Sequence, residues 1–180
     1  LEADQDACLY SLARHALSSV LKSAQAIPGQ KVLLPSFICR DLLASLRSAG
    51  VAPVWYEIDE CLKPETLPSG WPSASFVLAV NYFGFPQDLT PFYAYAARTG
   101  AIVIEDNAHG FLSQDVNGNW LGTRAPYGLF SMRKTLRMPD GAAMLMNKAV
   151  KEECAVAQLA FNGRGMNAAE IYKVQIRRVP

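Results

Sequence analysis

The sequence has no excess of charge of either sign and no long hydrophobic run. Its 17 basic and 16 acidic residues give a formal net charge of +1, so we expect no basic surface for nucleic acid or for an anionic membrane. Apolar runs such as residues 74–80 are far shorter than the roughly 18 residues that a membrane-spanning helix needs. With 180 residues, 51% of them hydrophobic, the chain can form one globular domain with its own core.

Cysteine is also scarce, and the residues are scattered singly at Cys8, Cys39, Cys61 and Cys154. The C-x-x-C pairs of a zinc site are missing, and the density is far below that of a disulfide-bonded secreted domain. No basic-then-apolar leader is visible. We therefore expect reduced thiols and a cytoplasmic location.

Several sequence motifs of common enzymes are missing as well. The chain has no G-x-G-x-x-G and no G-x-x-x-x-G-K-[ST], so dinucleotide and nucleoside triphosphate sites have no support. It has no G-x-S-x-G of a serine hydrolase. With two histidines and no H-E-x-x-H, we expect no metal site.

Strand-like and helix-like segments alternate along the chain. Helical spacing predicts helices over residues 10–25, 37–50, 88–100 and 148–161, whereas apolar runs predict strands over 31–35, 51–60, 76–84, 101–106, 127–134 and 142–147. Asn117-Gly118 predicts a tight hairpin turn, and the tail 172–180 has no evident partner. This alternation predicts an α/β fold, with a mostly parallel sheet and helices on both faces.

Two adjacent acids, Glu105 and Asp106, end the apolar strand predicted over 101–106. A buried carboxylate is costly unless it is paired, and ligands of parallel sheets bind beyond the carboxyl ends of the strands. A cationic ligand there would explain the acids. Considered alone, Asp106 has helix N-capping as its ordinary role, and the two roles can coexist.

Pyridoxal phosphate is a cofactor whose protonated pyridine ring is a cation. It needs a lysine, an acid that keeps the pyridine nitrogen protonated, and donors for its phosphate. Asp106 ends one predicted strand, and Ser131 and Lys134 end a later one, so a parallel sheet would bring them to one edge. His109 follows Asp106 by three residues and would lie near the phenolic oxygen of the ring. By itself, Lys134 among basic neighbours would be read as a solvated turn.

The stretches "GQKVLLPSFICRDLLASLRSAGVAPVWYEID", "VNYFGFP", "IVIEDNAHG", "LGT" and "FSMRKTLRMPDGAAML" carry a resemblance to a known family. Over roughly residues 10–150 the chain resembles the DegT/DnrJ/EryC1/StrS sugar aminotransferases, which depend on pyridoxal phosphate. The resemblance implies the aspartate aminotransferase type of fold and a homodimer with sites at the subunit interface. It also implies amino transfer from an amino acid, usually glutamate, to a nucleotide-linked keto sugar.

By position, the resemblance implies that Asp106 pairs with the pyridine nitrogen and that His109 lies near the phenolic oxygen. It implies that Ser131 contacts the phosphate and that Lys134 is the Schiff-base lysine. This chain has three positions from serine to lysine where many members have five, whereas Asp140-Gly141 keep their usual distance from the lysine.

Residues 13–17 match the start of the phosphate-binding helix, which implies Arg14 and His15 as cofactor-binding residues, with Arg14 in place of a hydroxyl. Cys39 stands where the family often has an aromatic residue that stacks on the cofactor, so the ring must pack differently or against Phe37. The residues alone favour plainer roles. His15 and His109 would be structural histidines, Arg14 an exposed helix residue and Cys39 a small buried group.

For domain organisation, we expect a large cofactor-binding domain over residues 1–150. Residues 151–180 would begin the connection to a small carboxy-terminal domain that lies outside this chain. The expected function is an aminotransferase of glycan or secondary-metabolite sugar biosynthesis, for example for lipopolysaccharide or O-antigen. Two alternatives stay open: a sugar dehydratase on the same fold, which Lys134 argues against because related dehydratases typically have histidine there, and a non-catalytic or truncated cofactor-binding homologue.

Overall fold

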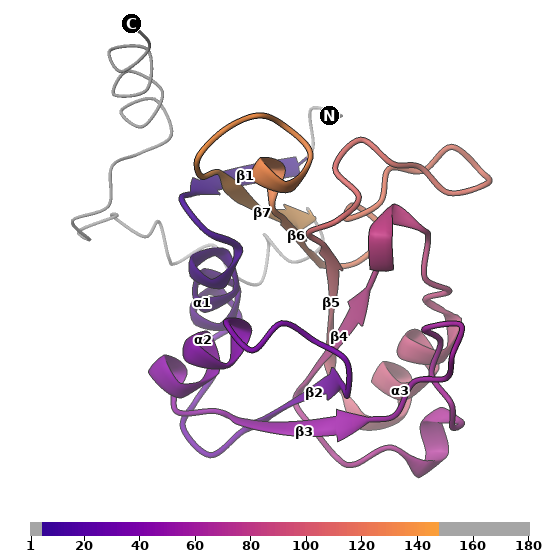
Figure 1. Ribbon diagram of the computed structural model, residues 1–180. Coiled ribbons are helices and arrows are strands. Elements are labelled where there is room, and N and C mark those ends of the chain that lie inside the picture. Colours follow the sequence, from indigo (N-terminus) through magenta and orange to yellow (C-terminus); the bar gives the residue numbers. More distant parts are fainter. Residues whose placement is uncertain (1–4, 148–180) are drawn as a thin grey trace, which may run out of the picture.

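The computed structural model describes residues 5–147, which form a seven-stranded sheet in the order β1-β7-β6-β5-β4-β2-β3 (Figure 1). The strands are β1 (Gln5–Tyr10), β2 (Lys31–Pro35), β3 (Ala52–Tyr56), β4 (Phe76–Val80), β5 (Ile102–Asn107), β6 (Tyr127–Phe130) and β7 (Ala142–Asn147). Strands β2 to β6 are parallel, and β7 pairs antiparallel with both β6 and β1. The predicted mostly parallel sheet is confirmed.

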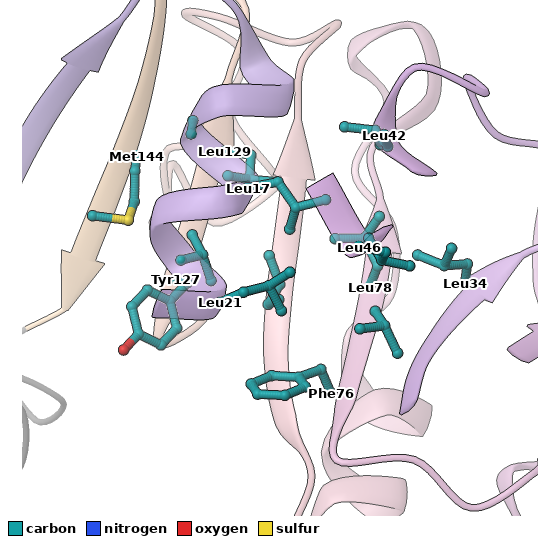
Figure 2. Close-up of a cluster of buried hydrophobic side chains, with 14 of the residues drawn as sticks. Leu17, Leu21, Leu34, Leu42, Leu46, Phe76, Leu78, Tyr127, Leu129 and Met144 are labelled. Atoms are coloured by element: carbon teal, nitrogen blue, oxygen red, sulfur yellow. The ribbon is translucent and has the colours of Figure 1, made fainter. Parts of the chain in front are cut away.

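Helices cover both faces of this sheet, because its central strands are apolar on both sides. The helices are α1 (Ala13–Ser23), α2 (Leu42–Ala49) and α3 (Thr90–Thr99). Helix α1 buries Leu17 and Leu21, and Figure 2 shows these side chains beside Phe76, Leu78 and Leu129 of the sheet. Helix α3 packs on the opposite face.

Along β5 the side chains alternate between these two faces. Val103 belongs to the cluster under α3, together with Phe92 and Tyr95 of that helix. Ile104, the next residue, belongs to the cluster under α1 and α2. Since side chains have a period of two along a strand, Glu105 continues the α3 face and Asp106 continues the α1 and α2 face.

Several predicted boundaries were wrong. The first helix begins at Ala13 and not at residue 10, because Tyr10 ends β1, an edge strand with too little apolar patterning to be recognised. The predicted strand 76–84 ends at Val80, where a 3-10 turn follows with φ of 54° at Phe83. The predicted helix 37–50 begins only at Leu42.

Further predictions concern the hairpin after β5, the segments beyond residue 147 and the absence of a membrane-spanning helix. A hairpin with an antiparallel bridge between Gln114 and Trp120 forms here, but its loop spans residues 116–118 and is not the predicted tight turn of Asn117 and Gly118 alone, because the Asp115 N–H donates to the Asn119 carbonyl at 2.9 Å. The predicted helix 148–161 and the tail 172–180 lie outside the described residues. Within residues 5–147, no helix has the length and apolar character to cross a membrane.

Candidate active site

Asp106 lies at the carboxyl end of β5 and is almost completely buried, with 5% of its surface exposed. Its Oδ1 accepts a hydrogen bond from the Ala108 N–H at 2.9 Å. Burial raises the pKa of Asp106, and the Ala108 N–H and the Lys134 ammonium partly oppose this rise. The carboxylate is therefore costly to keep charged without a further cationic partner.

Glu105, the other acid of the pair, has a different environment. It is fully buried and forms an ion pair with Arg124, whose Nη2 lies 2.7 Å from Oε1. Asn81 Nδ2 also donates to this carboxylate at 2.8 Å. Among residues 5–147, Glu105 thus has a cation in ion-pair contact, whereas Asp106 forms no ion pair.

A cavity of about 430 Å³ lies on the Asp106 side of the sheet. Its wall is formed by the amino end of α1, the segment between β2 and α2, and the segments that follow β4, β5 and β6. Six of the seven residues predicted as site residues line it, namely Arg14, Cys39, Asp106, His109, Ser131 and Lys134. The parallel register explains this, because the carboxyl ends of β4, β5 and β6 meet at one edge.

His15 is the predicted site residue that does not line this cavity. It is an exposed residue of α1, and its Nδ1 lies 3.1 Å from the Ser11 hydroxyl. Burial, and then the neighbouring Arg14, lower the pKa of His15. His15 is therefore not among the residues that we propose for cofactor binding.

The spacing of three positions between Ser131 and Lys134 corresponds to one 3-10 turn, Met132–Lys134. The Lys134 N–H donates to the Ser131 carbonyl at 3.0 Å, and the Arg133 N–H donates to the Gly141 carbonyl at 3.3 Å. Ser131 is buried and Lys134 is exposed, yet both line the cavity. A short spacing therefore still brings hydroxyl and amine to one wall.

His109 is held by the turn that follows β4. The Phe83 N–H donates to His109 Nδ1 at 3.3 Å, and the two rings stack with centroids 5.7 Å apart. Burial lowers the pKa of His109, and the Lys134 ammonium lowers it further. Because Nδ1 accepts a hydrogen bond, the neutral ring carries its proton on Nε2, which can act as a donor.

Three polar lining residues were not found from the sequence: Asp41, Tyr82 and Arg133. Asp41 lies 3.4 Å from Arg14 in an exposed ion pair. Tyr82 donates from its hydroxyl to the Phe37 carbonyl, and its ring stacks on Phe37 at 5.9 Å. The only available signal was the adjacency of Arg133 to Lys134. Contacts such as that of Tyr82 with Phe37, 45 residues apart, leave no local pattern.

These residues fit pyridoxal phosphate. The volume is within the range of small-molecule sites, and a buried acid with a raised pKa suits a protonated ring nitrogen. Lys134 supplies a primary amine, and Ser131 and Arg14 supply a hydroxyl and a guanidinium for an anion. Phe37, with 59% of its surface exposed at the cavity, offers an aromatic face that Cys39 lacks.

The chain resembles known proteins over part of their length. The chain is 28% identical over 176 residues to the pleiotropic regulatory protein of Geobacillus stearothermophilus, which covers 88% of this chain and 46% of that protein. It is 28% identical over 120 residues to the UDP-N-acetyl-3-dehydro-alpha-D-glucosamine 3-aminotransferase of Acidithiobacillus ferrooxidans, which covers 64% of this chain and 32% of that protein. The chain thus spans less than half the length of both relatives.

Two solved structures show the same fold. An aminotransferase from Streptoalloteichus hindustanus superposes with a TM-score of 0.71 at 24% identity over 97% of this chain and 53% of that one. The GDP-4-keto-6-deoxy-D-mannose-3-dehydratase of E. coli superposes with a TM-score of 0.68 at 18% identity, over 80% of this chain and 40% of that one. The model of one family matches residues 5–176, nearly the whole chain. The chain therefore belongs to the DegT/DnrJ/EryC1/StrS aminotransferase family, as its sequence motifs predicted.

Proposed function

We propose that the full-length protein is a pyridoxal-phosphate-dependent aminotransferase that acts on a nucleotide-linked keto sugar, with an amino acid such as glutamate as donor. The observation that carries this proposal is the presence of Asp106 and Lys134 on the wall of one cavity. The printed name of the Acidithiobacillus ferrooxidans relative, an aminotransferase of a UDP-linked sugar, supports the substrate class.

The bound cofactor would supply an electron sink for the carbon that loses its proton. Lys134 Nζ would hold the cofactor covalently and, once released, would carry the proton to and from the reacting carbon as a general base and acid. The Asp106 carboxylate would keep a proton on the ring nitrogen. Ser131 and Arg14 would bind the phosphate, and His109 Nε2 would donate to the phenolic oxygen.

Lys134 also separates the proposal from a sugar dehydratase. The dehydratase of E. coli shares the fold at 18% identity, and a fold likeness at this identity does not indicate which reaction the present protein catalyses. Because the related dehydratases typically have histidine in place of the Schiff-base lysine, Lys134 favours amino transfer. A homologue that bound no cofactor would have no need for Asp106 and Lys134 on one cavity wall, and turnover distinguishes an enzyme from a cofactor-binding homologue without activity.

We propose further that the protein is a homodimer, as the family resemblance implies. Apolar side chains on the segments that follow β4 and β5 support this, because they are exposed at the edge of the sheet that holds the cavity: Phe83 66%, Phe85 74%, Leu112 63%, Val116 96% and Trp120 45%. Large exposed apolar groups in one region favour contact with another protein surface.

Absorption spectroscopy of the full-length protein tests the proposed function. With pyridoxal phosphate added, the protein should show a visible band that glutamate converts. Lys134→Ala should abolish both the band and turnover, whereas Lys22→Ala, an exposed lysine of α1, should change neither. Normal turnover in Lys134→Ala would contradict the proposal.

A further inference from the structure

The ion pair between Glu105 and Arg124 lies behind Asp106, on the opposite face of β5. Arg124 contacts Glu105 three times. Its Nε and Nη2 donate to Oε1 at 2.9 and 2.7 Å, and its backbone N–H donates to Oε2 at 2.9 Å. The Glu105 side chain has no exposed surface, and 15% of the Arg124 side chain is exposed. This is a nearly dry ion pair with all its main contacts inside the protein.

Arg124 also reaches the residue that follows β4. Its Nη2 donates to Asn81 Oδ1 at 3.0 Å and to the Gln87 carbonyl at 3.2 Å. The Asn81 backbone N–H in turn donates to the Asp106 carbonyl at 2.9 Å. Arg124 is therefore connected to Asp106 along two routes, through Glu105, its neighbour in β5, and through Asn81.

The position of the pair has an electrostatic consequence. Asp106 is buried and already has a raised pKa, so a second charge one residue away is felt strongly in its low-dielectric surroundings. An unpaired Glu105 carboxylate would raise the pKa of Asp106 further. An unpaired Arg124 guanidinium would lower it. Together the two charges nearly cancel.

We propose that Arg124 and Glu105 are positioning residues for Asp106. They fix the carboxyl ends of β4 and β5 from the far face of the sheet, and the Arg124 guanidinium offsets the charge of the Glu105 carboxylate there. The charge of Asp106 is then set by what enters the cavity. This inference rests on the proposed function only in giving Asp106 a cofactor nitrogen to contact, since the contacts of Arg124 exist without it.

The pKa of Asp106 in the cofactor-free full-length protein tests the proposal. It can be followed by NMR of aspartate labelled at the carboxyl carbon, with Asp106→Asn used to assign the signal. We expect Arg124→Gln to raise this pKa and Glu105→Gln to lower it, each by on the order of one unit. The double variant should return close to the parent value.

The other charged or titratable groups around Asp106 are unchanged in these variants, so a shift in the pKa of Asp106 reports the ion pair between Glu105 and Arg124. They are Tyr56, Tyr82, Lys134 and the charged or titratable cavity residues Arg14, Cys39, Asp41, His109 and Arg133. Asp115→Asn is the matched control. It removes an acid 3.7 Å from the same guanidinium without touching Glu105, and it should move the pKa of Asp106 far less.

Cofactor affinity gives a second measurement. Arg124→Gln should weaken binding of pyridoxal phosphate, because the residues that follow β4 and β5 lose their common contact, and Arg124→Lys should recover part of it. Shifts of the same sign in both single variants, or no shift in either, would overturn the proposal. Should Arg124→Gln fail to fold, Glu105→Gln and the double variant still decide it. Because the pKa is measured without cofactor, this result is independent of whether Lys134→Ala abolishes turnover.

Discussion

Replacement of Asp106 by asparagine separates a cofactor-binding acid from a turn cap. The Asp106 carboxylate accepts one backbone hydrogen bond, from Ala108 at 2.9 Å, and 5% of the residue is exposed. Asparagine has the same shape and can still accept that bond through its side-chain oxygen, but it cannot stabilise a protonated ring nitrogen. The loss of a buried, charge-assisted hydrogen bond amounts to roughly 2 to 5 kcal/mol.

At about 1.4 kcal/mol per factor of ten, this loss predicts a decrease in kcat of on the order of 30-fold to several thousand-fold, provided that it is felt mainly in the transition state. The cofactor should still become attached to Lys134. Steady-state turnover and the visible band, measured on the same preparation, check both expectations.

The same Asp106→Asn substitution should lower turnover but should not lower the thermal stability of the cofactor-free protein. Because burial raises the pKa of Asp106 above the ordinary aspartate value of 3.8, its stabilising contribution is fully present below that pH and is lost as the pH rises through the folded-state pKa. Without cofactor, Asp106→Asn should therefore unfold at the same or a higher temperature than the parent at neutral pH.

Asp88→Asn is a matched control for this experiment. Asp88 Oδ1 accepts the N–H of Thr90 at 2.9 Å, which is the same contact two residues along the chain, but Asp88 does not line the cavity. It should keep normal turnover. If Asp106→Asn also kept normal turnover, Asp106 would be a turn cap alone and the site assignment would be wrong.

Further predictions concern pH and packing. His109 has a lowered pKa, so its stabilising contribution is present above the unfolded pKa of about 6.5 and is lost as the pH falls toward the folded value; His109→Gln should flatten the loss of melting temperature below pH 6.5. Gly110→Ala should lower the free energy of unfolding by about 1 to 3 kcal/mol in urea titrations, because the added Cβ would overlap the Asn107 side chain and lie 3.0 Å from Gly84 Cα; an unchanged midpoint would refute this close packing. Leu17→Ala should lower the free energy of unfolding by about 2 to 5 kcal/mol, since Leu17 is fully buried against the sheet. Ala44→Gly, on the exposed side of α2, should lower it by about 1 kcal/mol.

The sequence predicts well which residues lie at the edge of the sheet that holds the cavity, and the reason is physical. Strands β4, β5 and β6 are apolar runs, and in a parallel sheet their carboxyl ends meet. The positions of Asp106, Ser131 and Lys134 along the chain are then sufficient to bring them together. The helical spacing of α1 likewise predicts the face that packs on the sheet.

The contacts that the sequence did not reveal join distant segments. Arg124 lies in the segment between β5 and β6 and pairs with Glu105, 19 residues earlier. Both acids of the pair Glu105-Asp106 were expected to serve a ligand, and only the alternation of faces along β5 separates their roles. Strand β1 was missed because its partner, β7, lies at the other end of the described chain.

Mass spectrometry of the full-length protein after reduction with borohydride tests the central claim most directly. Reduction fixes the bond between a lysine and pyridoxal phosphate, and digestion then locates the modified residue. The account predicts one modified peptide, which carries the cofactor on Lys134, and no modification in the Lys134→Ala variant. Modification of another lysine, or no modification after incubation with cofactor, would contradict it.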